Sequence, residues 1–139
     1  MNSSFFYIWL THKLIMNKVR VGVVGLGRLG ITYAENIRFH TQNVSLVAVC
    51  SQVEEELAKA QKELGVTSCF KNIEEMIASI ELDAVVIVSP SNYNAKQSIY
   101  CLKKGLHVFC EKPLATTIKA CKEVEVIVAK KPSQVFMLG

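Results

Sequence analysis

The sequence predicts an α/β fold, in which helices cover both faces of a doubly wound, parallel β-sheet. From Val19 onward, apolar runs of strand length alternate with segments of helical periodicity. The apolar runs lack polar alternation, which indicates strands that are buried on both faces. A helical segment separates each strand from the next, as the crossover between parallel strands requires. Half of the 139 residues are hydrophobic and 20% are charged, which is typical of one globular domain.

The first strands and helices follow from the spacing of apolar residues. A strand is expected at 19–24, and it ends at a cluster of glycines. The helix after it presents one face formed by Gly30, Tyr33, Ala34 and Ile37. The next strand is expected at 44–50. It is followed by a helix from Val53 to Leu64, which can end in a left-handed cap at Gly65.

The remaining elements continue this alternation. A weak strand lies near 68–71, and the helix after it can begin at Asn72 as N-cap with Glu75 as capping-box partner. The strongest strand, 84–88, is entirely apolar and mostly β-branched. The later elements are a helix that ends at Gly105, a strand at 107–110, a helix around 120–128 and a strand at 134–138.

The predicted sheet has a ligand-binding edge. Right-handed crossovers arrange strands of this kind in the order 3-2-1-4-5-6. Ligands of such sheets bind outside the carboxyl ends of the strands, at the point where the strand order reverses. The loops after the first and fourth strands therefore flank the expected site.

A glycine-rich loop stands at this edge. Residues 25–30 read Gly-Leu-Gly-Arg-Leu-Gly, follow the first strand directly and open a helix. In this context G-x-G-x-x-G is typical of a Rossmann dinucleotide-binding domain, although a glycine-rich turn without a ligand is the alternative. Gly25 permits the tight turn, Gly27 lets a pyrophosphate approach the backbone, and Gly30 lets the helix pack closely on the strand. The pyrophosphate then meets free N–H groups at the positive end of the helix.

The end of the second strand lacks the acid that usually accompanies this motif. An acidic side chain is expected about 20 positions after the loop, where it holds the adenosine ribose. Ser51 stands there, and Glu54 is the nearest carboxylate in the sequence. A serine can hydrogen-bond a 2′-hydroxyl or a 2′-phosphate, and no arginine replaces the acid, so the predicted cofactor is NAD or NADP. Arg28 can reach a phosphate or be an ordinary solvated side chain.

Two further loops follow strands at the same edge. Ser89-Pro90-Ser91-Asn92 lies across the crevice from the glycine loop, although Ser91 or Asn92 can simply cap the next helix. Glu111-Lys112-Pro113 ends the fifth strand, where Lys112 can place a positive charge on the substrate side of the crevice. The X-Pro bond of this run can be cis.

The composition argues against several other functions. The net charge of +4 is not concentrated in any run of five basic residues, so nucleic-acid binding is not expected. Five cysteines occur without a C-x-x-C pair, which favours free thiols in the reducing cytoplasm over disulfides or a metal site. We expect residues 1–17 to be an N-terminal extension and 18–139 to be the dinucleotide-binding domain. The apolar run in the extension is too short to span a membrane, and we expect it to have no functional weight and no membrane partner. The alternative is that this run binds a partner or a membrane surface.

With these residues in place, the chain resembles the N-terminal domain of the Gfo/Idh/MocA oxidoreductases, the family of glucose–fructose oxidoreductase and inositol 2-dehydrogenase. The resemblance covers nearly all of 18–139 and is strongest to inositol 2-dehydrogenases. Its most specific parts are the loop 25–30, the turn 89–92 and the run Glu111-Lys112-Pro113-Leu114. The resemblance implies an NAD(P)-dependent dehydrogenase that transfers hydride between the nicotinamide and a sugar or cyclitol hydroxyl.

The resemblance also implies individual site residues. The pyrophosphate would be bound by the loop residues Gly25, Gly27, Arg28, Leu29 and Gly30. The adenosine ribose would contact Ser51, and the nicotinamide side would be lined by Ser89, Pro90 and Asn92. Glu111 and Lys112 would contact the nicotinamide ribose and the substrate, and Lys112 would assist hydride transfer as a catalytic residue. The resemblance implies no metal site.

The sequence departs from the family pattern in several places. Ser51 replaces the aspartate of NAD-preferring members, and Asn94 stands where a histidine often follows the turn. The chain also stops at Gly139, whereas members continue into a second domain that binds substrate, supplies acid–base residues and often makes oligomer contacts. We therefore expect the cofactor half of a truncated oxidoreductase, and leave a homo-oligomer open. The alternatives are a non-catalytic module that senses NAD(P) or docks on a partner, and a truncated product without a stable function.

Overall fold

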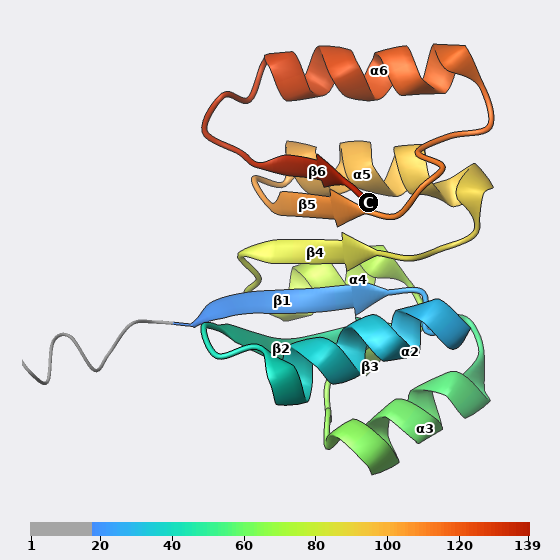
Figure 1. Ribbon diagram of the computed structural model, residues 1–139, viewed down its shortest axis with the longest axis vertical. Helices are drawn as coiled ribbons and strands as arrows, with labels where there is room; N and C mark the ends of the chain where they lie inside the picture. The colour runs from blue at the N-terminus through green and yellow to red at the C-terminus, as the bar shows by residue number, and fades with distance from the viewer. Residues whose placement is uncertain (1–17) are drawn as a thin grey trace, which may run out of the picture.

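The computed structural model describes residues 18–139, so the expectations for residues 1–17 lie outside the described residues. The described chain forms one parallel sheet of six strands in the order β3-β2-β1-β4-β5-β6, which confirms the predicted fold and strand order (Figure 1). All neighbouring strands pair in parallel. The strands are β1 (Val19–Val24), β2 (Val44–Cys50), β3 (Cys69–Phe70), β4 (Ala84–Ile87), β5 (His107–Cys110) and β6 (Phe136–Leu138).

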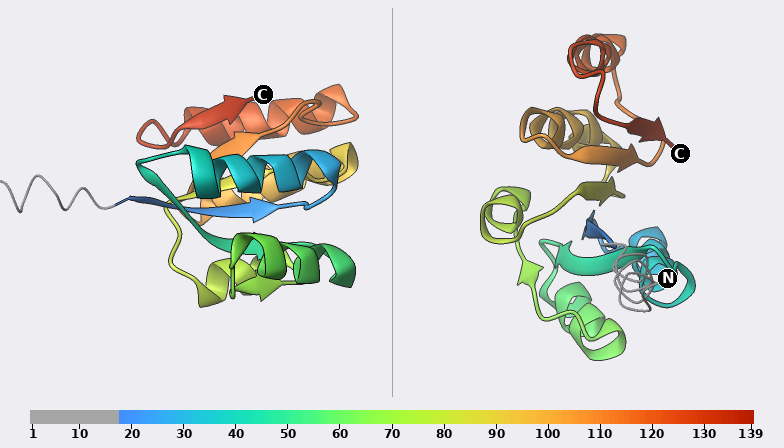
Figure 2. Two further views of the ribbon diagram at one scale, coloured as in Figure 1. Left: turned by 60° about the horizontal axis from the view of Figure 1, so that its bottom comes forward. Right: turned by 90° about the vertical axis from the view of Figure 1, so that its left-hand side faces the viewer.

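Helices cover both faces of the sheet (Figure 2). One face carries α2 (Arg28–Glu35), its π-helical continuation η1 (Asn36–His40) and α3 (Glu54–Leu64). The other face carries α4 (Ile73–Ser79), α5 (Ser91–Lys103) and α6 (Ile118–Ala129). This division of the helices between the two faces makes the sheet doubly wound, and the strand order reverses between β1 and β4.

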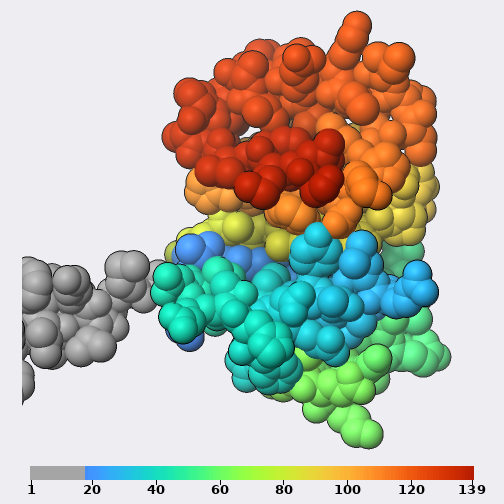
Figure 3. Space-filling view, in the orientation of Figure 1, coloured from blue at the N-terminus to red at the C-terminus, as the bar shows by residue number. Residues whose placement is uncertain are grey.

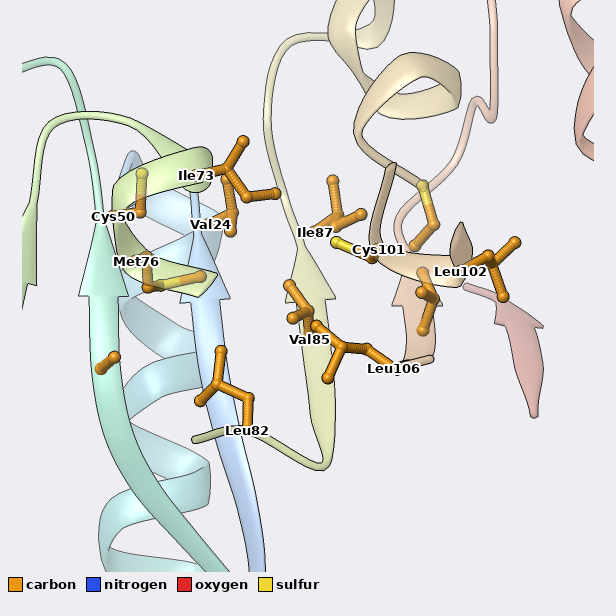
Figure 4. Close-up of a cluster of buried hydrophobic side chains, with 13 residues drawn as sticks. Val24, Cys50, Ile73, Met76, Leu82, Val85, Ile87, Cys101, Leu102 and Leu106 are labelled. Carbon is orange, nitrogen blue, oxygen red and sulfur yellow. The ribbon is translucent and has the colours of Figure 1, made fainter. Parts of the chain in front are cut away.

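Each face of the sheet has its own hydrophobic core. In the larger core, Val85 and Ile87 of β4 pack with Met76 of α4 and Leu102 of α5 (Figure 4). Val23 of β1 points to the opposite face and belongs to the core beneath α2 and α3. Side chains that alternate between two buried faces explain why these strands lack polar residues.

The helix ends follow the local signals with one exception. Gly65 ends α3 with a φ of 66°, as the left-handed cap requires. The N–H of Glu75 donates to Oδ1 of Asn72 at 2.8 Å, which confirms Asn72 as the cap of α4. The exception is α2, which ends at Glu35 as an α-helix, so that Ile37 packs against the core from the π-helical turn η1.

The sheet edge at β6 is exposed. Met137 and Leu138 have 56% and 48% of their surface exposed, and β6 lies on the face of the molecule that Figure 3 shows.

Within residues 18–139, no helix combines the length and the apolar character needed to cross a membrane.

An ion pair joins the amino ends of β1 and β4, at the edge opposite the expected site. Arg20 donates from Nε and Nη2 to the carboxylate of Asp83 at 3.1 and 2.9 Å, and its Nη1 contacts Glu81 at 2.6 Å. The hydrogen bonds from Arg20 lower the pKa of Asp83 to about 2. The Arg20 and Asp83 side chains are 35% and 38% exposed, so solvent screening limits what the pair contributes to stability.

We predict that Asp83→Asn lowers the free energy of unfolding at neutral pH by no more than about 1 kcal/mol. Because the pKa of Asp83 is depressed in the folded chain, its contribution is present above the unfolded value of about 3.9. This contribution is lost as the pH falls toward about 2. Urea titrations of both proteins across this interval would check it, and a stability difference that does not shrink with falling pH would contradict it. Glu81→Gln, at a side chain that is 84% exposed, is the control and should change less.

Candidate cofactor-binding site

A cavity of about 850 Å³ lies at the carboxyl ends of the central strands, beside the beginnings of α2, α3 and α5. Its volume is within the range of small-molecule and cofactor sites. The cavity brings together the predicted residues Gly25, Gly27, Arg28, Leu29, Gly30, Ser51, Ser89 and Pro90. It does not include the predicted residues Asn92, Glu111 and Lys112. Another cavity, of about 730 Å³, lies between α5 and α6 and contains none of the predicted site residues.

Two glycines of the loop are required by the fold itself. Gly25 has a φ of 88°, and a Cβ on it would lie 2.5 Å from the carbonyl oxygen of Val88, which follows β4. A Cβ on Gly30 would lie 1.8 Å from the carbonyl oxygen of Gly25. Both positions therefore exclude a side chain, because the start of α2 packs directly on the backbone at the ends of β1 and β4.

Gly27 has no such reason within the chain. Its φ of −58° and ψ of −175° are accessible to any residue. Within residues 18–139, and apart from its chain neighbours, the only atom within 4 Å of an added Cβ would be Oε1 of Glu56, at 4.0 Å. A side chain on Gly27 would thus extend into open space that belongs to the cavity. This open space next to the backbone fits a pyrophosphate, which needs an approach that no Cβ obstructs.

The helices that begin at the cavity leave backbone donors free. Among the helices of residues 18–139, α2, α3 and α5 begin without a side-chain cap, whereas Asn72 caps α4 and Thr117 caps α6. The first N–H groups of a helix have no intrahelical partner and carry its positive dipole end. The first turns of α2 and α5 also contain no acidic residue. The cavity is therefore suited to an anionic ligand.

Ser51 holds a carboxylate at the end of β2. The side chain is buried, with 7% of its surface exposed, and its hydroxyl donates to Oε2 of Glu56 at 2.5 Å. The Ser51 hydroxyl oxygen also accepts a hydrogen bond from the backbone N–H of Val53 at 3.1 Å. Glu56 is half-buried in the first turn of α3 and lines the cavity. An acid therefore stands at the end of β2 after all, but it comes from the next helix.

Glu56 was not predicted, because Glu54 is closer to Ser51 along the chain. In the structure Glu54 pairs with Nζ of Lys71 at 2.6 Å, which raises the pKa of that lysine. Glu56 immediately precedes Leu57, the first residue of the buried stripe of α3, so its side chain starts at the border of the buried face. The position of Glu56 relative to the apolar stripe was the sequence signal that its side chain lies near the core.

The turn after β4 contributes to the cavity through its first residues. Ser89 is half-buried and lines the cavity together with Pro90. Pro90 occupies the cap position of α5, so the alternative in which Ser91 or Asn92 caps this helix is wrong. Asn92 is exposed on the first turn of α5 and is not among the residues that line the cavity.

Glu111 is fixed between β5 and α2. Its Oε1 accepts the hydroxyl of Tyr33 at 2.5 Å, and its Oε2 accepts the backbone N–H of Lys112 at 3.0 Å. The hydrogen bond to Glu111, together with burial and the negative charge, raises the pKa of Tyr33 to about 12. The Tyr33 ring packs on Phe109 with centroids 5.4 Å apart. Lys112 itself is exposed, and its bond to Pro113 is cis.

Asn94 holds this loop from the other face of the sheet. It is 1% exposed, and its Nδ2 donates to the carbonyl oxygens of Glu111 at 3.1 Å and Pro113 at 2.9 Å. In the sequence Asn94 stands out only as a departure from the family pattern. Its position eight residues before Leu102, at the border of the apolar stripe of this helix, was the signal that its side chain faces inward. The position of Lys112 therefore depends on Asn94.

The chain belongs to the Gfo/Idh/MocA family, described as an oxidoreductase family with an NAD-binding Rossmann fold, whose family model matches residues 19–138. Myo-inositol 2-dehydrogenase of Thermotoga maritima is 37% identical over 100 residues, which are 72% of this chain and 30% of that protein. The NAD(+)-dependent scyllo-inositol 2-dehydrogenase of Bacillus subtilis is 30% identical over 106 residues, or 76% of this chain and 31% of the relative.

Solved structures show the same likeness. The scyllo-inositol dehydrogenase of Lactobacillus casei, with bound NAD(H) and scyllo-inositol, has a TM-score of 0.86 and 40% identity over 88% of this chain and 36% of that chain. Myo-inositol 2-dehydrogenase of Lactobacillus plantarum has a TM-score of 0.87 and 36% identity, with coverage of 88% and 36%. The chain thus spans about a third of the length of the relatives that it matches.

We predict that Asn94→Ala destabilises the chain by about 1–3 kcal/mol, because the buried Asn94 side chain no longer donates its two hydrogen bonds to the backbone of the β5 loop. Urea unfolding measures this change. Asn92→Ala, on the same helix but exposed, is the matched control and should stay within about 0.5 kcal/mol of the wild type. Equal stability of the two variants would show that Asn94 does not hold the loop.

Proposed function

We propose that residues 18–139 form a dinucleotide-binding domain whose cavity holds NAD or NADP, and that it serves a dehydrogenase acting on a cyclitol or sugar hydroxyl. The open space beside Gly27 is the observation that carries the proposal. Neither backbone geometry nor packing requires glycine there, whereas a pyrophosphate on the uncapped start of α2 does. Membership of an NAD-binding oxidoreductase family and the inositol dehydrogenases among the relatives support the cofactor and the substrate class.

The proposal assigns a part of the ligand to each side of the cavity. Backbone N–H groups of the loop from Gly25 to Gly30 hold the pyrophosphate, with Arg28 and Leu29 at its border. The end of β2 at Ser51 lies toward the adenosine ribose. The turn after β4, which begins with Ser89 and Pro90 and includes Asn92, lies toward the nicotinamide.

Glu111 and Lys112 are proposed to complete the nicotinamide side. When bound, the nicotinamide ring accepts or returns a hydride. In the proposal, Glu111 contacts the nicotinamide ribose, and Tyr33 fixes its carboxylate. The exposed ammonium of Lys112 then holds the substrate hydroxyl and stabilises the negative charge that develops on its oxygen.

The proposed location is the cytoplasm, where thiols stay reduced. The cysteines Cys50, Cys69, Cys101, Cys110 and Cys121 are all free, and burial raises the pKa of Cys50 and Cys101 to about 12. Thiols of this kind are unreactive and behave as small hydrophobic residues. Association into a homo-oligomer stays an alternative that sedimentation analysis would decide.

We predict that Gly27→Val abolishes binding of NADH while the chain stays folded. The valine side chain would fill the space proposed for the pyrophosphate, but apart from its chain neighbours its Cβ would meet no atom of residues 18–139 closer than 4.0 Å. Fluorescence titration with NADH and a thermal melt of each protein measure the two effects. Lys119→Val, at an exposed residue in the first turn of α6, is the matched control and should bind normally. Unchanged affinity of Gly27→Val would overturn the pyrophosphate assignment.

Turnover is tested separately from binding. The chain would be incubated with NAD and myo-inositol, scyllo-inositol or a hexose, and NADH formation followed by absorbance. Binding without turnover agrees with a cofactor domain or with a non-catalytic NAD(P)-binding module, because hydride transfer also needs a positioned substrate and a proton acceptor. A wild-type chain that binds neither NADH nor NADPH would contradict the proposed function.

A further inference from the structure

We propose that Glu56 binds the adenosine ribose hydroxyls and makes the site selective for NAD(H) over NADP(H). The inference rests on the proposed function and names the residue that decides which dinucleotide the cavity accepts. It differs from the expectation drawn from the sequence, in which Ser51 faces the ribose and neither cofactor is preferred. The observations that carry it are the hydrogen bonds of Ser51, the position of the second oxygen of Glu56 and the pairing of Lys71 with Glu54.

The Ser51 hydroxyl is already engaged within the chain. Its proton is donated to Oε2 of Glu56 at 2.5 Å, and its oxygen accepts the N–H of Val53 at 3.1 Å. A hydroxyl has one proton to donate, so Ser51 cannot donate a hydrogen bond to a ribose oxygen or to a 2′-phosphate. We therefore assign Ser51 as a positioning residue, which orients Glu56.

The other oxygen of Glu56 is directed to the glycine loop. Oε1 lies 4.0 Å from the position that a Cβ added to Gly27 would occupy, on the side of the cavity where the pyrophosphate is proposed. Within residues 18–139, no ion pair involves Glu56. A carboxylate oxygen accepts hydrogen bonds only, and the 2′- and 3′-hydroxyls of an adenosine ribose are donors beside the pyrophosphate. Glu56 thus supplies the acceptor that usually stands at the end of the second strand.

The charges around this position disfavour a 2′-phosphate. A phosphate at the 2′-oxygen would bring a doubly negative group next to the Glu56 carboxylate, and like charges repel strongly in a partly buried site. Lys71, the cavity-lining lysine that directly follows β3, is paired with Glu54 at 2.6 Å. Arg28 also lines the cavity, but it begins α2 and lies at the border of the proposed pyrophosphate position.

The test is a comparison of NADH and NADPH affinities by fluorescence titration. We expect the wild type to bind NADH at least about tenfold more tightly than NADPH. Glu56→Gln keeps the shape of the side chain but removes its charge, so the ratio of the two dissociation constants should fall about tenfold. Ser51→Ala should shift the ratio in the same direction by less, because Glu56 keeps its charge but loses its anchor.

Glu55→Gln is the matched control, since it removes the same charge from the exposed neighbour in the same helical turn. Its ratio should equal that of the wild type. Thermal melts of all variants show whether each is folded. Two outcomes would overturn the inference: a wild type without preference for NADH, or a ratio that Glu56→Gln leaves unchanged. Either outcome leaves the proposed function intact as long as the wild type binds a dinucleotide. If the wild type binds neither NADH nor NADPH, both the inference and the proposed function are wrong.

Discussion

The contact between the glycine loop and the chain that follows β4 is the constraint on which the site depends. Gly25 and Gly30 have no room for a side chain, because their Cβ positions fall on the carbonyl groups of Val88 and Gly25. This close packing holds the start of α2 at the point where the strand order reverses. The free N–H groups of that helix then face the cavity, and the space beside Gly27 stays open to a ligand.

The loop after β5 is held from both faces of the sheet, which gives the proposed substrate side a defined position. Asn94, on α5, binds the backbone of this loop, and Tyr33, on α2, binds the Glu111 carboxylate. The two helices belong to opposite layers, so the loop is connected to both cores. The backbone at Lys112 is therefore held in position, although the Lys112 side chain is exposed to solvent.

The acid at the end of β2 illustrates how a site can keep its chemistry when one residue changes. A carboxylate can reach the same edge of the sheet from the strand end or from the first turn of the helix that follows. In this chain Ser51 occupies the strand end and binds Glu56 of α3, which restores a negative group beside the glycine loop. The relatives share the fold over about a third of their length.

The spacing of apolar residues was sufficient to predict the strands and the crossovers, and the G-x-G-x-x-G motif predicted the glycine loop, because these depend on local backbone preference and on two-sided burial. The strands β3 and β6 are shorter than predicted, since the extent of a strand also depends on the neighbour with which it pairs. The polar partners of the site could not be predicted in the same way. Glu56 reaches Ser51, and Asn94 reaches Pro113, through side-chain directions that the register and packing of α3 and α5 determine. A linear pattern records how far apart two residues stand in the chain, whereas a hydrogen bond depends on where their side chains end in space.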